Sequence, residues 1–168
     1  MKYIISSFLF LLTFYSVKAQ DIFSYARANN VTEISKFKAD INKKNDQGYT
    51  PLILAVYNNS YEAAKWLLEN GAEPDLQDNN GNTALIGATF KGYYNMVQLL
   101  LSYKAGVNVK NYNDATALIY ASVFGKPEIL KLLLENGADK SMKDNRGNTA
   151  LQHAIMQGNE EAIRLLEK

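Results

Sequence analysis

The chain has 168 residues, of which 47% are hydrophobic, and its 18 Lys and Arg nearly balance its 17 Asp and Glu. This balance argues against a nucleic-acid-binding surface, which needs clustered Lys and Arg, and the length suits a single domain. The absence of cysteine excludes disulfides, thiol catalysis and cysteine-bound metal sites.

Residues 1–19 have the pattern of a secretory signal peptide. Lys2 provides a positively charged start, residues 4–17 are mostly apolar, and small or medium side chains precede a cleavage site before Gln20. The apolar run is shorter than the roughly 20 residues that cross a bilayer, so cleavage is favoured over the alternative of a retained anchor. We therefore expect an exported protein, periplasmic or secreted and of bacterial source, whose mature chain, residues 20–168, does not insert into a membrane.

Residues 21–44 predict an opening pair of short helices, near 22–26 and 31–37, with a break at Asn29 and Asn30. The second of these helices is one turn shorter and more polar than its later counterparts. A shortened, polar terminal unit closes the core of a helical stack from water. We expect this segment to be an N-terminal cap.

A threonine then recurs every 33 residues, within a frame of Asn, Asp and Gly that is repeated around it. A fixed period of this length indicates a repeat architecture. The threonines are Thr50, Thr83, Thr116 and Thr149. The units that they define lie near residues 45–77, 78–110 and 111–143, with a C-terminal cap repeat at 144–168.

Each unit predicts a polar turn, a short helix and a longer helix. The threonine suits the N-cap of the short helix, because its hydroxyl accepts from the free amides of the first turn. The short helices are expected over residues 50–58, 83–91, 116–124 and 149–157. They should end at residues that tolerate the left-handed conformation, namely Asn59, Gly92, Gly125 and Gly158.

The residue pattern also predicts how the units pack. One position of the short helix always holds alanine, which lets neighbouring helices approach closely: Ala55, Ala88, Ala121 and Ala154. The longer helices are apolar over too wide an arc for a single buried stripe, so each should pack on its partner and on the next unit. In the last unit Glu167 replaces Leu134 in register, which predicts a polar end to the stack.

These residues carry a resemblance to a known family. Gly-Asn-Thr-Ala-Leu at 81–85 and 147–151, together with the helix-ending Asn-Gly-Ala-Glu turn at 70–73 and Asn-Gly-Ala-Asp turn at 136–139, resembles the ankyrin repeat. The resemblance covers residues 21–168. It implies an all-α fold, an ankyrin-repeat solenoid of five stacked helix pairs with β-hairpin finger loops that project at about right angles to the helices.

The chain departs from the family pattern in two places. The histidine that usually follows Thr-Pro-Leu is Ile or Gln in every unit, and the single histidine, His153, is one residue away from that position. In the third unit Lys104 and Asp114 stand where glycines are expected, although both positions call for a left-handed backbone. We therefore expect the finger at residues 103–116 to be the most irregular and mobile.

No residue pattern predicts catalysis, and no cofactor or metal is expected. His153 has no cysteine to act with, and it lies within a short amphipathic helix. The recurring aspartates of the fingers lack the alternating oxygen ligands and the terminal glutamate of a calcium loop. They are better explained as turn formers.

What remains is a surface for binding another protein. In ankyrin-like proteins, partners bind the finger tips and the exposed side of the first helices, so the resemblance implies a concave face whose aromatic residues are set among Asn and Gln, as in protein-binding paratopes. The alternative for each aromatic is that it packs against a neighbouring finger. The face comprises Asp46, Gln47, Tyr49, Tyr57, Asn58, Asn79, Asn80, Asn82, Phe90, Lys91, Tyr112, Asn113, Val123, Phe124, Asn145, Arg146, Asn148, Met156 and Gln157.

The sequence thus predicts a monomeric, non-catalytic interaction module that binds a partner protein. Two narrower roles stay open beside it. One is an immunity or inhibitor protein that neutralises an exported toxin or enzyme, and the other is an accessory protein of a stress-response enzyme. An enzyme is disfavoured because no acid–base pair or activated nucleophile is apparent.

Overall fold

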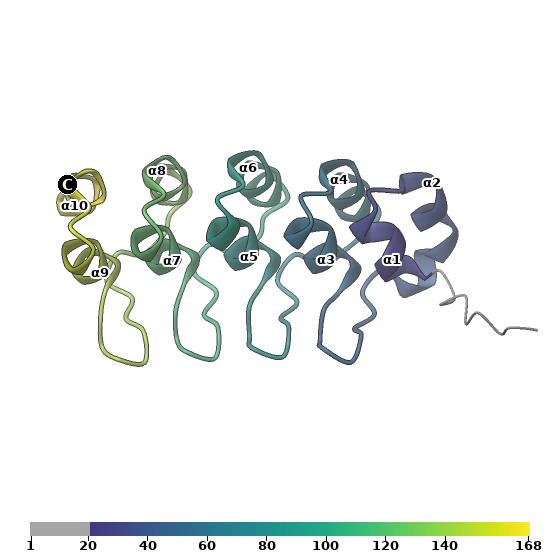
Figure 1. The fold of residues 1–168 in the computed structure, drawn as a ribbon, viewed down its shortest axis with the longest axis horizontal. Helices are drawn as coiled ribbons and strands as arrows, with labels where there is room; N and C mark the ends of the chain where they lie inside the picture. The colour runs from purple at the N-terminus through teal and green to yellow at the C-terminus, as the bar shows by residue number, and fades with distance from the viewer. Residues whose placement is uncertain (1–20) are drawn as a thin grey trace, which may run out of the picture.

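A computed structural model describes residues 21–168, which form five helix pairs stacked in a row (Figure 1). The leader predicted at residues 1–19 lies outside the described residues. The first helices of the pairs are α1 (Ile22–Arg27), α3 (Pro51–Tyr57), α5 (Ala84–Lys91), α7 (Ala117–Val123) and α9 (Ala150–Met156). The second helices are α2 (Val31–Ile34), α4 (Tyr61–Glu69), α6 (Tyr94–Ser102), α8 (Pro127–Glu135) and α10 (Glu160–Glu167), and α2 continues into the 3-10 helix η1 (Ser35–Asp40).

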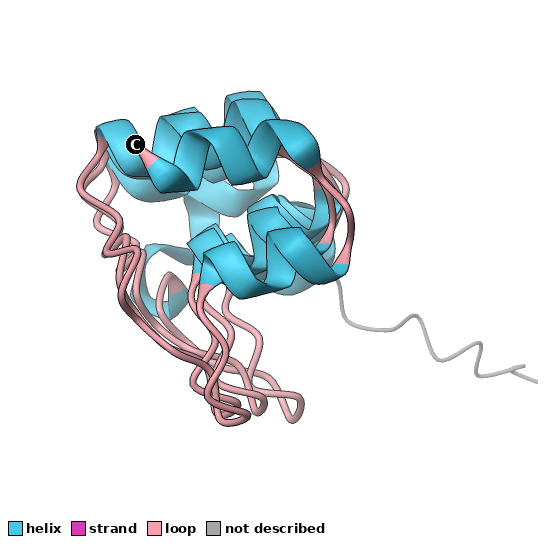
Figure 2. Ribbon diagram, turned by 90° about the vertical axis from the view of Figure 1, so that its left-hand side faces the viewer, coloured by secondary structure: helices cyan, strands magenta, loops and turns pink. Residues whose placement is uncertain are grey.

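The helices form two layers, with all first helices in one and all second helices in the other (Figure 2). Finger loops hang from the layer of first helices, and neighbouring fingers lie side by side along the stack (Figure 1). The expected all-α solenoid of five helix pairs is confirmed. No helix in the described part of the chain is long and apolar enough to cross a membrane.

The recurring threonines cap the first helices as expected. Thr50 Oγ1 accepts from Ile53 N at 3.2 Å, and Thr83, Thr116 and Thr149 accept at 3.3–3.4 Å from the amide three residues on. Each helix begins one residue after its threonine, because the N-cap residue itself has an extended backbone. The helices are followed by left-handed residues, with φ of 54°, 75°, 59° and 65° at Asn59, Gly92, Gly125 and Gly158.

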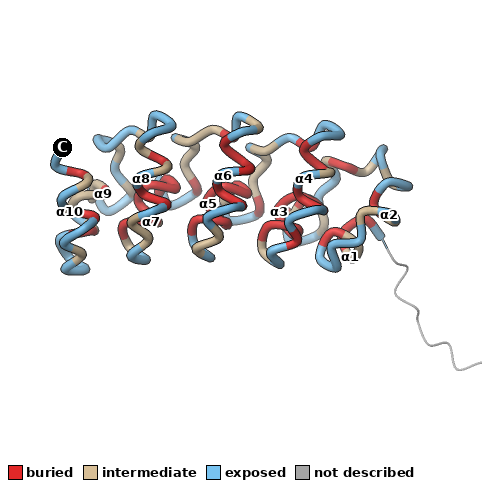
Figure 3. Tube along the Cα trace, turned by 90° about the horizontal axis from the view of Figure 1, so that it is seen from above, coloured by how far each residue is buried: buried red, intermediate tan, exposed pale blue. Residues whose placement is uncertain are grey.

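The core lies between the helices of successive units, where buried segments run along the whole stack (Figure 3). The recurring alanines, from Ala55 to Ala154, are completely buried at the contacts between first helices. The next residue along these helices is also fully buried, and it is Val56, Thr89 and Ser122 in successive units. Ser122 Oγ donates to Leu118 O at 3.0 Å, whereas Thr89 Oγ1 has no hydrogen-bond partner among the described residues.

The two ends of the stack differ from its middle. At the N-terminus α2 is only four residues long, and Ile34 is its one buried side chain. At the C-terminus α10 turns Glu167 to solvent, but Ile155 on α9 is 56% exposed although its counterparts in earlier units are covered by the next unit. The polar end predicted for the stack is therefore provided by α10 and not by α9.

Hydrogen bonds across the turn close each finger. In the second finger Asp78 N donates to Asn82 O at 3.0 Å, and Asp78 Oδ1 accepts from Asn80 N and Asn82 N. The fingers contain no regular strand in residues 21–168, and one isolated antiparallel bridge joins Lys143 and Thr149. They are hairpin-shaped turns held by these few bonds.

The third finger keeps the same frame in spite of its two substituted glycines. Asn111 N donates to Ala115 O at 3.0 Å and Asp114 N donates to Asn111 O at 2.9 Å, which matches the second finger. Lys104 and Asp114 adopt the left-handed conformation that glycine would occupy, with φ of 63° and 57°. The expected irregularity is absent from the backbone hydrogen bonds, and the expected mobility stays a prediction.

Each finger is also bonded to the next. Asn79 N donates to Gln47 O at 3.3 Å, Tyr112 N to Asn80 O at 3.1 Å, and Asn145 N to Asn113 O at 2.9 Å. The close approach needs a glycine, because a Cβ at Gly81 would lie 2.6 Å from the backbone nitrogen of Tyr112. The four fingers therefore form one connected row.

Gly81→Ala should cost more stability than Gly147→Ala. Both glycines have a positive φ, of 77° and 82°, which penalises alanine by about 1 kcal/mol in each case. Gly81 faces Tyr112 whereas nothing lies within 4 Å of a Cβ at Gly147, so the Gly81 variant should lose roughly 1–2 kcal/mol more. Urea unfolding of the two variants measures the difference, and equal losses would show that the fingers are not in close contact.

Thr89→Val should stabilise the protein by about 1 kcal/mol. The substitution keeps the shape of the side chain and removes a buried hydroxyl that has no partner within residues 21–168. Ser122→Ala is the matched control, because it removes a hydroxyl that is hydrogen-bonded at the same position of the next unit and should therefore lower stability. The urea midpoint reports both changes, and a destabilised Thr89→Val would mean that the Thr89 hydroxyl is in fact paired.

Candidate functional site

The predicted residues lie on a surface that we name the finger face, formed by the tips of the four fingers and the exposed sides of α3, α5, α7 and α9. Most of them are exposed to solvent. These are Asp46, Gln47, Asn58, Asn79, Asn80, Phe90, Lys91, Tyr112, Asn113, Phe124, Asn145, Arg146, Met156 and Gln157. The remaining five are half-buried: Tyr49, Tyr57, Asn82, Val123 and Asn148.

Tyr49 and Tyr57 pack mainly within the protein. Their rings meet edge to face with centroids 5.7 Å apart. Tyr57 also lies over Gly87 of the next unit, where a Cβ would be 3.2 Å from its ring. Burial, together with the nearby carboxylate of Asp78, raises the pKa of Tyr57 to about 12. In the unit at residues 45–77 the two aromatic side chains therefore pack within the protein, against each other and against the next unit, so packing is favoured over binding for these two.

The middle of the finger face carries an aromatic cluster of Phe90, Tyr120 and Phe124. Phe90 and Phe124 contact edge to face with centroids 4.9 Å apart, and Tyr120 stacks on Phe124 at 5.9 Å. Phe90 and Phe124 are each 43% exposed. The cluster brings two of the predicted residues together across the contact between α5 and α7.

Tyr120 is a member of this cluster that was not among the predicted residues. The available signal was its spacing, since residues four apart on a helix lie on one face and Tyr120 precedes Phe124 by four. Its hydroxyl oxygen accepts from Asn111 Nδ2 at 3.1 Å, and the same amide group donates to Asn82 Oδ1 at 2.9 Å. Tyr120 thus links the cluster to the bases of the second and third fingers.

His153 occupies the position of Tyr120 in the last unit and makes the equivalent contact. His153 Nε2 lies 2.7 Å from Asp144 Oδ2, while Asp144 Oδ1 accepts from the backbone amides of Arg146 and Asn148. Burial opposes ionisation of Asp144, but the hydrogen bonds from Asn148, His153 and Arg146 outweigh it and lower the pKa of the carboxyl group. The pair fastens the fourth finger to α9, which is a structural role.

Two hollows flank the aromatic cluster on the finger face. The larger, of about 340 Å³, lies on the side of the fourth finger, and its lining includes the buried Ala115 and Ile119, the exposed Phe124 and Arg146, and the bonded pair of Asp144 and His153. The smaller, of about 170 Å³, is lined by Tyr57, Asn82, Ile86, Gly87, Phe90 and Tyr120. The cluster thus stands between two spaces that can receive side chains.

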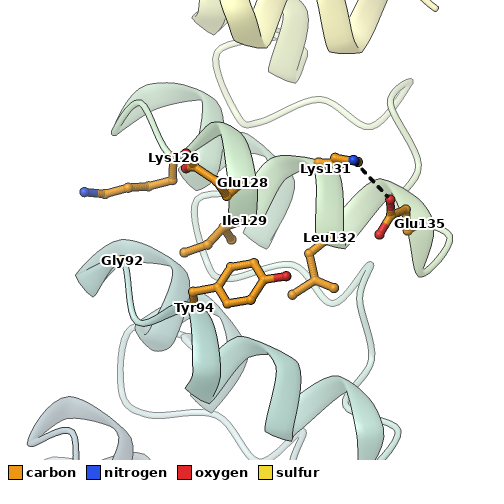
Figure 4. Close-up of a pocket in the computed structure, with 8 residues that line it drawn as sticks. All are labelled: Gly92, Tyr94, Lys126, Glu128, Ile129, Lys131, Leu132 and Glu135. Atoms are coloured by element: carbon orange, nitrogen blue, oxygen red, sulfur yellow. Dashed lines mark ion pairs between the residues drawn. The ribbon is translucent and has the colours of Figure 1, made fainter.

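A third hollow, of about 460 Å³, lies away from the finger face, between α6 and α8 (Figure 4). Tyr94, Ile129 and Leu132 supply its apolar lining. Its charges are of both signs, and Lys131 Nζ lies 3.9 Å from Glu135 Oε1. None of the predicted residues lines it.

The arrangement offers surface contacts of several kinds. In residues 21–168 no three His, Cys, Asp or Glu side chains come together to hold a metal ion. The one histidine is bonded to a carboxylate that already accepts two backbone amides. The chemistry available is that of exposed aromatic rings, amide groups and two rim cations, Lys91 and Arg146.

Comparison with known proteins agrees with the geometry. The family model described as "Ankyrin repeats (3 copies)" matches residues 19–111, 72–144 and 104–168. The chain is also similar to ankyrin repeat domain-containing protein 49 of Drosophila melanogaster, at 49% identity over 49 residues, which is 29% of this chain and only 23% of that protein. Since the matches to the family model together span residues 19–168, the chain belongs to the ankyrin-repeat family.

Proposed function

We propose that this protein is a non-catalytic module that captures a partner protein on its finger face. Ankyrin repeats are generally protein–protein interaction modules, and the chain carries them along its length. The observation that carries the proposal is the aromatic cluster, whose Phe90 and Phe124 are held half-exposed on packed helices. Aromatic side chains in such settings contribute most of the binding energy at protein interfaces.

The distribution of exposed apolar side chains supports this face over others. Among the described residues the large exposed hydrophobics are Tyr61, Phe90, Tyr94, Tyr112, Phe124, Ile155 and Met156. Four of them, Phe90, Tyr112, Phe124 and Met156, lie on the finger face, and Tyr112 is 70% exposed at a finger tip. Exposed rings cost solvation free energy, so a cluster of them on one side favours a binding role.

The connected fingers suit the same role. Bonds from Asn79 to Gln47, from Tyr112 to Asn80 and from Asn145 to Asn113 hold the tips in one arrangement before a partner arrives. A preformed surface loses less conformational entropy on association than a mobile one. The amide groups of the tips supply adaptable hydrogen bonds around the aromatic anchors.

We also propose that the protein is exported and acts as a monomer outside the cytoplasm. The support for export is the charged start, apolar run and small-residue exit of residues 1–19. N-terminal sequencing of protein recovered from the source cells tests this, with Gln20 expected as the first residue. A chain that still begins at Met1 would favour the retained anchor.

The double substitution Phe90→Ala and Phe124→Ala should weaken partner binding by at least about tenfold, because buried aromatic anchors are typically worth 2 kcal/mol or more. The partner is first captured by crosslinking in the exporting compartment, identified by mass spectrometry and purified for titration calorimetry. The matched control is Tyr61→Ala with Tyr94→Ala, which removes two rings of similar exposure from the second helices. Unchanged affinity in the Phe variant, with loss in the Tyr variant, would place binding on the opposite layer.

A further inference from the structure

The two exposed charged side chains beside the aromatic cluster that form no ion pair in the described part of the chain are both positively charged. Lys91 follows Phe90 on α5, and its Nζ lies 6.0 Å from the centroid of the Phe90 ring. Arg146, on the fourth finger, lines the hollow beside Phe124. Neither cation takes part in an ion pair within residues 21–168.

The neighbouring carboxylates are already engaged. Asp144 accepts from two backbone amides and is bonded to His153. Asp114 Oδ1 lies 3.3 Å from Lys110 Nζ at the third finger. The free acidic group of the finger face is Asp46 of the first finger, whereas Arg146 belongs to the fourth. These two fingers stand at opposite ends of the row (Figure 1). Around α5, α7 and the fourth finger, Lys91 and Arg146 are therefore the exposed charged side chains of the predicted face that form no ion pair within residues 21–168, and they lie beside exposed aromatic rings.

We propose that the partner binds this part of the finger face with an acidic–apolar segment, in which a bulky apolar side chain is flanked by carboxylates. The proposal rests on the function proposed above and adds the chemistry of the partner. The apolar side chain enters the hollow of about 340 Å³, whose floor is Ala115 and Ile119 and whose wall is Tyr120 and Phe124. Carboxylates on either side of it reach Arg146 and Lys91.

The two cations suit this occupant in different ways. The guanidinium group of Arg146 offers a planar pair of donors that matches a carboxylate, and the ammonium group of Lys91 acts as a point charge. A cationic segment would instead meet both groups as like charges, and Lys91 already lies near the ring of Phe90. Because charges at the rim of an interface act on partner choice more than on affinity, they should determine which sequences bind.

The test is a selection from a random dodecapeptide library against the purified full chain. The unmodified protein should enrich peptides that place Asp or Glu beside Phe, Leu, Ile or Trp. The charge-reversed variant Lys91→Glu with Arg146→Glu should enrich Lys or Arg at the same places. The control variant Lys65→Glu with Arg164→Glu reverses two exposed cations of the second helices and should leave the selected sequences unchanged.

Fluorescence anisotropy with the most enriched peptide then measures its affinity for each variant. The charge-reversed variant should bind it at least about tenfold more weakly, and raising the salt concentration should weaken binding to the unmodified protein, as expected for screened charges. Thermal unfolding by circular dichroism checks that both double variants are folded, which is expected because all four side chains are exposed.

These experiments distinguish failure of the acidic–apolar segment from failure of the proposed function. Enriched peptides that are apolar without any preference for acidic residues would overturn the acidic–apolar segment while leaving the finger face as the binding surface. Peptides whose binding survives Phe90→Ala with Phe124→Ala would overturn the finger face itself, and with it the proposed function. Enrichment no greater than on empty support would also count against the acidic–apolar segment.

Discussion

The structure depends on how closely the first helices of neighbouring units approach one another. The completely buried alanines, from Ala55 to Ala154, allow this approach because they place only a methyl group between the helices. No unit can bury its apolar surface alone, so the free energy of folding comes from stacking. The same spacing brings successive fingers into hydrogen-bonding contact and places Phe90 of one unit against Phe124 of the next.

A constant frame leaves some positions free to differ, and those positions give the finger face its character. One such position follows the first Asn or Asp of each finger turn by nine residues. It holds Leu54, Gly87, Tyr120 and His153 in successive units. Gly87 leaves a space that Tyr57 fills, Tyr120 joins the aromatic cluster, and His153 binds Asp144. One register position thus produces a packed, an aromatic and a polar surface without any change in the fold.

Local rules were enough to predict the frame. Threonine caps, left-handed helix ends and the 33-residue period depend on residues close in sequence, and each is found at the predicted position. The β-hairpin fingers were predicted in outline, although they are turns held by a few bonds. The third finger keeps a regular frame because Lys104 and Asp114 can adopt the strained backbone that glycine would have taken freely.

The finger face was harder to predict, because exposure there is decided between units. Tyr57 occupies the same register position as Phe90, 33 residues later, but the absence of a side chain at Gly87 lets the Tyr57 ring pack against the next unit. Tyr120 was missed since its part in the cluster depends on contacts with Phe90 and Phe124 across two helices. Glu167 on α10 predicted a polar end to the stack, but the exposure of Ile155 on α9 was not predicted from the sequence.

These differences make the finger face asymmetric. Near the first finger the rings of Tyr49 and Tyr57 are packed together, and the free charge is that of Asp46. From α5 to the fourth finger the rings are exposed and the free charges are cations. Lys91 and Arg146 make no side-chain bond that the fold requires, so their replacement should cost little stability. The scaffold and the choice of partner are therefore carried by different residues, and the partner can change while the stack of helices stays the same.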